Sequence, residues 1–190
     1  MIEDILKYSD EIKDRIGEKR FLHTLRVKDT AIELAKIYSV DEDKAAVAGL
    51  LHDCAKIRDV NLLKEEAQEN GLKVEGDFEK APQIIHSYLG SLFAEKLYNV
   101  HDEDILNAIK YHTTGRENMS SLEKIIFLAD SIEPMRNFDG VIKLRELSYK
   151  DLDEAMYFSL NSTIKMLAEK NIYIVPETLY ARNFYREMVN

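Results

Sequence analysis

Apolar residues recur every three or four positions along most of this 190-residue chain, which is the spacing of one face of an α-helix. Boundary signals support this reading: Asp41 can cap a helix N-terminus, Ser120 and Glu123 form a capping box, and Pro134 follows a helix end. The pattern therefore predicts an all-α, single-domain helical bundle with helices at residues 2–15, 18–38, 42–56, 61–70, 82–98, 103–113, 121–133, 139–147, 152–170 and 177–188.

Two segments depart from the helical pattern. The stretch from Leu72 to Lys80 is polar and is predicted to be a mobile loop. Residues 172–175 are short and rich in β-branched residues, so we expect an extended segment before the last helix. The predicted organisation is one domain over residues 1–190, with the C-terminal segment 171–190 docking on it.

Composition limits the class of protein. A hydrophobic content of 45% and a charged content of 32% are typical of a globular domain. The net charge of -9 argues against binding long nucleic acid through a basic surface, although a small anionic substrate remains compatible with it. There is no apolar run long enough for a membrane span, and a single cysteine cannot form an internal disulfide. We therefore expect a cytoplasmic protein without membrane contact.

Six polar residues lie on apolar faces of the predicted helices. A single inward histidine is more often a hydrogen-bonded core residue than a metal ligand. Two buried carboxylates are harder to explain, because an unpaired buried charge is strongly unfavourable. A metal ion would satisfy all of them together. The sequence thus predicts a metal site formed by His23, His52, Asp53, His86, His112 and Asp130.

A second His-Asp pair serves as a comparison. His101 and Asp102 open a helix in a polar context, so Asp102 is predicted to be an N-cap and the pair is given no metal role. Cys54 follows Asp53 but has no base paired with it in the sequence. It is predicted to be a small buried hydrophobic residue.

The six residues occur within three more specific segments: LLHDCAK at 50–56, YHTTGR at 111–116 and LADSIEPMR at 128–136. From about Arg20 to the C-terminal tail, the chain resembles the two-metal branch of the HD superfamily of metal-dependent phosphohydrolases. Within that branch it resembles the YqeK-type symmetrical bis(5′-nucleosyl)-tetraphosphatases. The resemblance implies an HD-type helical domain that cleaves diadenosine tetraphosphate, a small-molecule dinucleoside polyphosphate, into two ADP. The resemblance does not decide whether the protein forms a homodimer.

The metal chemistry follows from the ligand types and from this resemblance. Two-metal sites hold their ions about 3.5–4 Å apart with a bridging hydroxide, which would attack phosphorus in line. Asp53 is predicted to bridge the ions and so to be catalytic. One ion would bind His23, His52, Asp53 and Asp130, and the other Asp53, His86 and His112. Imidazole and carboxylate ligands suit iron, manganese or zinc, and the resemblance favours two iron ions.

Basic residues near the proposed ligands predict a phosphate clamp, although any one of them alone would be read as a solvated surface charge. They are Arg20, Lys56, Arg116 and Arg136, with Lys56 also taken as catalytic and Thr113 as a substrate contact. Arg26 is an alternative partner for a core carboxylate. The tail residues Tyr173, Ile174, Val175, Pro176, Glu177 and Thr178 offer backbone groups that could read adenine. A docked tail is an equally good reading from the residues alone, and the family pattern favours nucleotide contact.

Two alternative functions remain open. One is an HD phosphohydrolase that acts on another nucleotide, such as a triphosphate or a cyclic dinucleotide. The other is a non-catalytic module that senses a nucleotide or iron. The complete set of ligands argues against the sensor, because a sensor does not need an open hydrolytic site.

Overall fold

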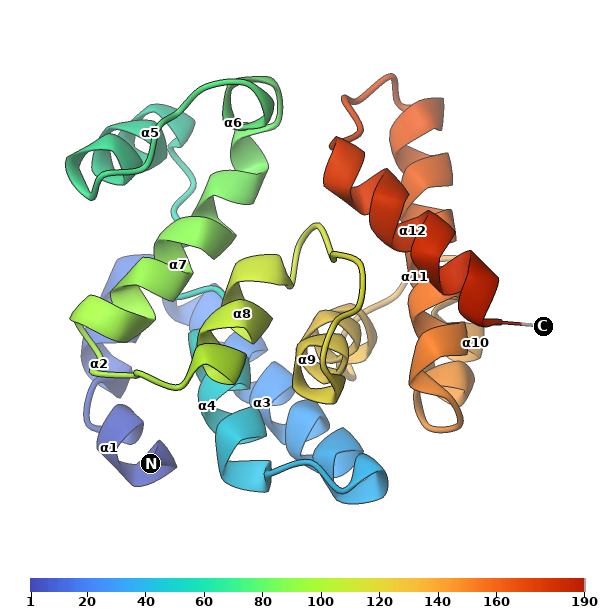
Figure 1. The fold of residues 1–190 in the computed structure, drawn as a ribbon. Helices are drawn as coiled ribbons and strands as arrows, with labels where there is room; N and C mark the ends of the chain where they lie inside the picture. The colour runs from blue at the N-terminus through green and yellow to red at the C-terminus, as the bar shows by residue number, and fades with distance from the viewer. Residues whose placement is uncertain (190) are drawn as a thin grey trace.

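Residues 1–189 are described by a computed structural model, and they form helices connected by short loops with no strand among them (Figure 1). The helices are α1 (Ile2–Leu6), α2 (Ser9–Ile16), α3 (Glu18–Tyr38), α4 (Glu42–Leu51), α5 (Val60–Glu69), α6 (Asp77–Lys80), the 3-10 helix η1 (Pro82–Ile84), α7 (Ile85–Lys96), α8 (Glu103–Tyr111), α9 (Ser121–Ile132), α10 (Val141–Ser148), α11 (Leu152–Glu169) and α12 (Pro176–Met188). The all-α prediction is confirmed.

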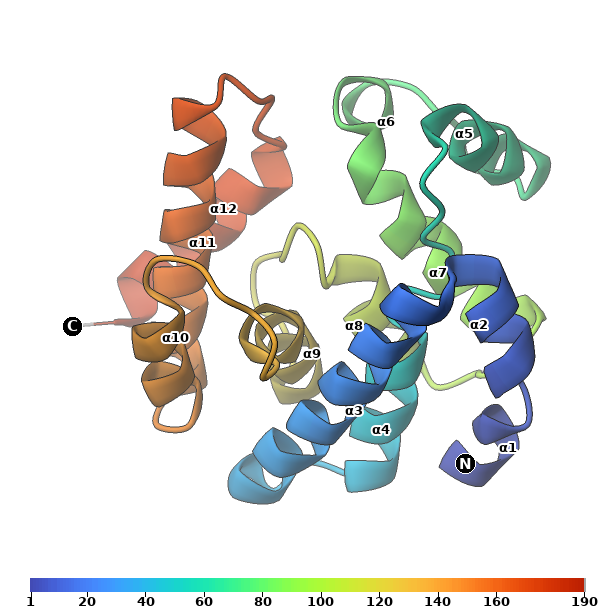
Figure 2. The same ribbon diagram turned by 180° about the vertical axis from the view of Figure 1, so that it is seen from behind.

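The helices α3 and α4 pack closely against each other at the centre of the fold (Figure 2). Gly49 makes this possible, because a Cβ atom there would lie 2.8 Å from the Cα of Lys28 on α3. The helices α8 and α9 pack beside this pair, and α7 packs on α8. The pair of α11 and α12 lies on the opposite side of α9 from α7 (Figure 1). The ends of several of these helices therefore meet in one place.

Several predicted boundaries are confirmed. The side chain of Asp41 accepts hydrogen bonds from the N–H groups of two residues in the first turn of α4. Ser120 and Glu123 form the predicted capping box at the start of α9. That helix ends at Ile132, just before Pro134. Residues 172–175 are non-helical, as expected.

Other boundaries were wrong, and hydrogen bonds show why. The first predicted helix is broken at Lys7 and Tyr8, where the Ser9 hydroxyl donates to the Leu6 carbonyl. The helix predicted to run to residue 56 ends at Leu51. There the Nδ1 of His52 donates to the Gly49 carbonyl, an acceptor that a continuing helix would need.

The predicted loop at 72–80 also differs from the structure, because its last four residues form α6. Phe78 in this helix packs against a small apolar cluster of Ala81, Ile84 and Val175. Phe78 thus contacts Val175, which is distant in sequence, and this contact explains the short helix in a mainly polar stretch. No helix within residues 1–189 is both long and apolar enough to cross a membrane.

Candidate metal centre

The structure brings the six predicted residues together from five parts of the chain. Five of them are buried, and the side chain of Asp130 is 20% exposed. They are His23 in the second turn of α3, His52 and Asp53 directly after α4, His86 at the start of α7, His112 directly after α8 and Asp130 in the last turn of α9. The cluster therefore forms where the ends of these helices meet.

The two carboxylate oxygens of Asp53 face two different groups of histidines. Its Oδ1 lies 3.1 Å from His86 Nε2 and 3.5 Å from His112 Nε2. Its Oδ2 lies 3.4 Å from His52 Nε2 and 4.0 Å from His23 Nε2. Atoms that share one ion at about 2.0–2.2 Å lie roughly 3–3.5 Å apart, so the separations to His86, His112 and His52 match shared coordination, and His23 lies slightly farther away.

Asp130 completes the second of these groups. Its Oδ1 is 2.9 Å from His23 Nε2 and 3.9 Å from His52 Nε2. The side chains of His23, His52 and Asp130 are close enough together to hold one ion, and so are those of His52, Asp53 and His112.

Two acceptors of the cluster lack a donor. The Nδ1 atoms of His52, His86 and His112 each donate to the carbonyl of the residue three positions earlier. Each ring therefore turns its Nε2 into the centre. His52 Nε2 and Asp53 Oδ1 are buried and form no hydrogen bond within residues 1–189. Buried acceptors of this kind require a cation, so the residues present fit a divalent metal ion.

Protonation states favour the same conclusion. Burial lowers the pKa of His86 to about 4, and the nearby charge of Lys56 acts in the same direction. Burial also lowers the pKa of His112. Both imidazoles are therefore neutral at pH 7, which is the form that binds metals.

The two carboxylates are ionised despite their burial. Burial alone would raise the pKa of Asp53, but the neighbouring imidazoles, His52 first, bring it well below the usual value. For Asp130, burial is likewise outweighed by the hydrogen bond from His23 and the charges of His52 and Arg136. The centre thus presents two negative charges and, at His86 and His112, two neutral nitrogen ligands.

Three of the four predicted clamp residues touch these carboxylates. Arg20 donates to Asp53 Oδ2 at 3.0 Å. Lys56 Nζ lies 3.4 Å from Asp53 Oδ1 and donates to His86 Nε2 at 3.3 Å. Arg136 donates to the backbone carbonyl of Asp130 at 2.7 Å and to its carboxylate. About one third of each of these side chains is exposed, so they line the mouth of the cluster.

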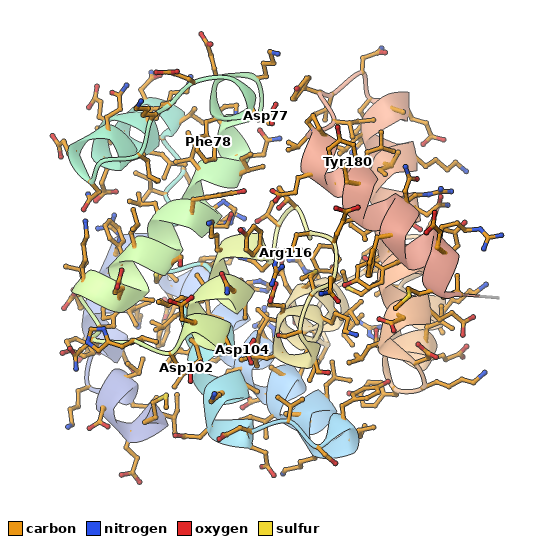
Figure 3. The ribbon with its side chains drawn as sticks, in the orientation of Figure 1. Asp77, Phe78, Asp102, Asp104, Arg116 and Tyr180 are labelled. Atoms are coloured by element: carbon orange, nitrogen blue, oxygen red, sulfur yellow. The ribbon has the colours of Figure 1, made fainter. Side chains whose placement is uncertain are left out.

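Arg116, the fourth predicted clamp residue, does not contact these carboxylates. It donates to both carboxylate oxygens of Glu123, at 2.7 and 2.6 Å, and its guanidinium stacks over the ring of Tyr111. Figure 3 places it on the connection between α8 and α9. From the sequence, Glu123 is recognisable only as part of a capping box, so its pairing with Arg116 was not predicted.

The tail residues contact the other side of the molecule near α6 and α7. Tyr173 donates from its hydroxyl to Asp77 at 2.7 Å, and Asp77 lies in α6 (Figure 3). Glu177 accepts from the Tyr88 hydroxyl at 2.9 Å. The hydroxyl of Thr113 lies 3.2 Å from His112 Nε2, which places it beside the cluster of histidines and aspartates.

The two comparison residues behave as expected. Asp102 caps α8 and pairs with Lys44 at 2.7 Å, and it lies at the start of that helix in Figure 3. His101 is exposed and lies 2.9 Å from the side chain of Asn99. Cys54 is fully buried, and burial raises its pKa to about 12, so it is an unreactive core residue.

The fold and the cluster together define a class of protein. The chain belongs to the HD-domain family, whose model matches residues 20–135. It is 44% identical to a symmetrical bis(5′-nucleosyl)-tetraphosphatase of Halalkalibacterium halodurans, with 90% of this chain and 91% of that protein covered. A protein of the same description from Bacillus subtilis is 38% identical, with 91% and 92% covered.

A solved structure has the same fold. It comes from Clostridium acetobutylicum and is described as a "predicted HD superfamily hydrolase involved in NAD metabolism". It is 42% identical, covers 96% of this chain and 97% of its own, and has a TM-score of 0.92. The HD domain and its cluster of histidines and aspartates imply that the protein binds a divalent metal.

Proposed function

We propose that this protein hydrolyses diadenosine tetraphosphate symmetrically into two ADP. The observation that carries the proposal is the position of Asp53, whose two oxygens face two separate groups of imidazoles. That arrangement suits a pair of ions, and paired ions suit in-line displacement at phosphorus. Relatives at 44% and 38% identity carry the name of this activity.

Two divalent ions, with iron as the proposed metal and manganese or zinc as substitutes, would share Asp53. His23, His52 and Asp130 would complete one coordination sphere, and His86 and His112 the other. The second sphere has fewer protein ligands, which leaves positions for substrate oxygens. When bound, the ions would supply a nucleophilic water at neutral pH and offset the charge of the phosphates.

The basic residues at the mouth would hold the phosphate chain. Arg20, Lys56 and Arg136 now pair with carboxylates that metal ions would neutralise. Their charges would then be available to phosphate oxygens, and Lys56 stands nearest to the reacting centre. Thr113 could donate its hydroxyl to the same phosphate. For Arg116 we propose a weaker contribution, because Glu123 already accepts from the Nε and Nη2 groups of its guanidinium.

The segment from Tyr173 to Thr178 is the proposed contact for the nucleoside. Among residues 1–189, no hydrogen bond is made by the backbone N–H groups of Tyr173, Ile174 and Val175. Such free groups can read the edge of a base. The contacts of Tyr173 with Asp77 and of Glu177 with Tyr88 would hold this segment in place.

The test is product analysis by ion-exchange chromatography with metal-loaded protein. Diadenosine tetraphosphate should yield ADP alone. The panel should include nucleoside triphosphates, cyclic dinucleotides and NAD⁺, the last because of the description of the Clostridium protein. ATP and AMP as products would contradict symmetrical cleavage, and tight binding without turnover would favour the sensor.

A further inference from the structure

Glu133 is a buried carboxylate that forms the C-cap of α9 and is 2% exposed. Its Oε1 lies 3.1 Å from His23 Nδ1. Its Oε2 accepts from Arg26 Nε at 2.6 Å and from the backbone N–H of Met135 at 2.8 Å. A carboxylate with donors on both oxygens is held in one position.

His23 differs from the other three histidines of the cluster in what orients it. The other three donate from Nδ1 to a carbonyl only three residues away. His23 instead uses a carboxylate from a different helix, 110 residues away in sequence. Because Arg26 donates to both oxygens of Glu133, at 2.6 and 3.4 Å, the carboxylate accepts from His23 Nδ1 as well, and Nε2 is left to face the metal site. A charged acceptor also makes an imidazole a stronger metal ligand than a neutral carbonyl does.

We propose that Glu133 is a positioning residue for the metal ion held by His23 and Asp130. It fixes the ring of His23 through Nδ1 and strengthens the bond that Nε2 forms. It therefore sets the affinity of this ion and leaves the ion near His86 and His112 unaffected. This inference rests on the proposed metal centre and not on the identity of the substrate.

The same residue also anchors the loop that carries a phosphate-clamp side chain. Glu133 accepts from the N–H of Met135, the residue before Arg136. Arg145 braces the loop by donating to the carbonyls of Glu133 at 3.0 Å and Arg136 at 2.8 Å. Arg136 in turn donates to Asp130. One buried carboxylate thus links a metal ligand to the guanidinium beside it.

The experiment is a Mn²⁺ titration of chelator-treated, full-length protein, followed by the electron paramagnetic resonance signal of free Mn²⁺. Glu133→Gln keeps the shape of the side chain and removes its charge. One of the two bound ions should weaken by about 10- to 100-fold, and the other should be unchanged. Excess metal should restore hydrolysis, and the metal concentration for half-maximal activity should rise by the same factor.

Glu123→Gln is the matched control. Glu123 is also buried on α9 and also pairs through both oxygens with an arginine, but its partners are Arg116 and Ser120. This variant should lose thermal stability while it binds both Mn²⁺ ions normally. Normal affinity in Glu133→Gln, or equal loss of affinity in both variants, would overturn the inference. Normal binding of both ions by His23→Ala would instead contradict the metal centre itself, so the two failures are distinguishable.

Discussion

The Nε2 atoms of His86 and His112 lie 3.2 Å apart, although each ring uses its Nδ1 to donate to a backbone carbonyl. In the neutral rings, two lone pairs therefore point at each other beside the Oδ1 atom of Asp53. The Lys56 ammonium, 3.3 Å from His86 Nε2, offsets part of this repulsion, and a metal ion bound by both rings would turn it into attraction.

Removal of metal should therefore destabilise the fold. At metal concentrations about 1,000 times the dissociation constant, linkage predicts roughly 4 kcal/mol of stabilisation. For a domain of this size, that corresponds to a fall in Tm of about 8–16 °C after treatment with EDTA. Differential scanning calorimetry of treated and reconstituted protein measures it. An unchanged Tm would mean that the cluster binds no metal.

Asp53→Ala should lose both ions and all hydrolysis, because its two oxygens face both groups of histidines. His86→Ala should chiefly weaken one ion. Metal quantitation by plasma emission, with activity assayed on the same preparation, separates the two outcomes. His101→Ala is the control, since His101 is exposed outside the cluster and should retain metal and activity. A fully active Asp53→Ala variant with two ions would contradict a bridging role.

Arg136→Ala should retain metal but reduce catalytic efficiency about 10- to 150-fold, the equivalent of roughly 1.5–3 kcal/mol for a charged hydrogen bond. Arg136→Lys should recover only part of this, because lysine lacks the planar fork. Arg116→Ala should have a smaller effect on kcat/KM and a larger effect on Tm, since Arg116 is bound to Glu123. Steady-state kinetics measure the first effect and thermal denaturation the second. If Arg116→Ala reduced kcat/KM more than Arg136→Ala, the phosphates would instead bind nearer to α8.

The metal-free protein should become less stable as the pH falls from 6.5 toward 4. In this range the unfolded chain binds a proton at His86, whereas the folded chain does not, because its pKa is about 4. The free energy of unfolding therefore rises with pH across this window. Urea denaturation at several pH values gives the slope, and His86→Gln should reduce it. Identical slopes in the two proteins would show that His86 has an ordinary pKa.

Periodicity was enough to place the candidate ligands inside the fold, because each of them lies on the apolar side of a helix or directly after its end. The spacing that placed His112 beside Ile109 and Ala108 also placed it in the core. Cap residues identified the start of α4 and α9 in the same way. These are local signals, and a single sequence contains them in full.

Contacts between distant segments could not be predicted in this way. Glu133 was visible in the sequence next to Pro134, yet nothing local shows that it orients His23. The sequence left Arg26 open as a partner for a core carboxylate, and in the structure that carboxylate is Glu133. Similarly, α6 forms in a polar stretch because Phe78 meets Val175, which lies almost one hundred positions later. Such effects depend on the packed fold rather than on local propensity.

The absence of one methyl group sets the distance between two proposed ligands of the same ion. Gly49 brings the backbone of α4 against that of α3, and a Cβ there would lie 2.8 Å from Lys28 Cα. His23 lies on α3, and His52 directly follows the end of α4. The distance between the two imidazoles thus depends on a glycine that is not itself a ligand. Alanine at position 49 would force the helices apart and enlarge the coordination sphere without altering a single ligand.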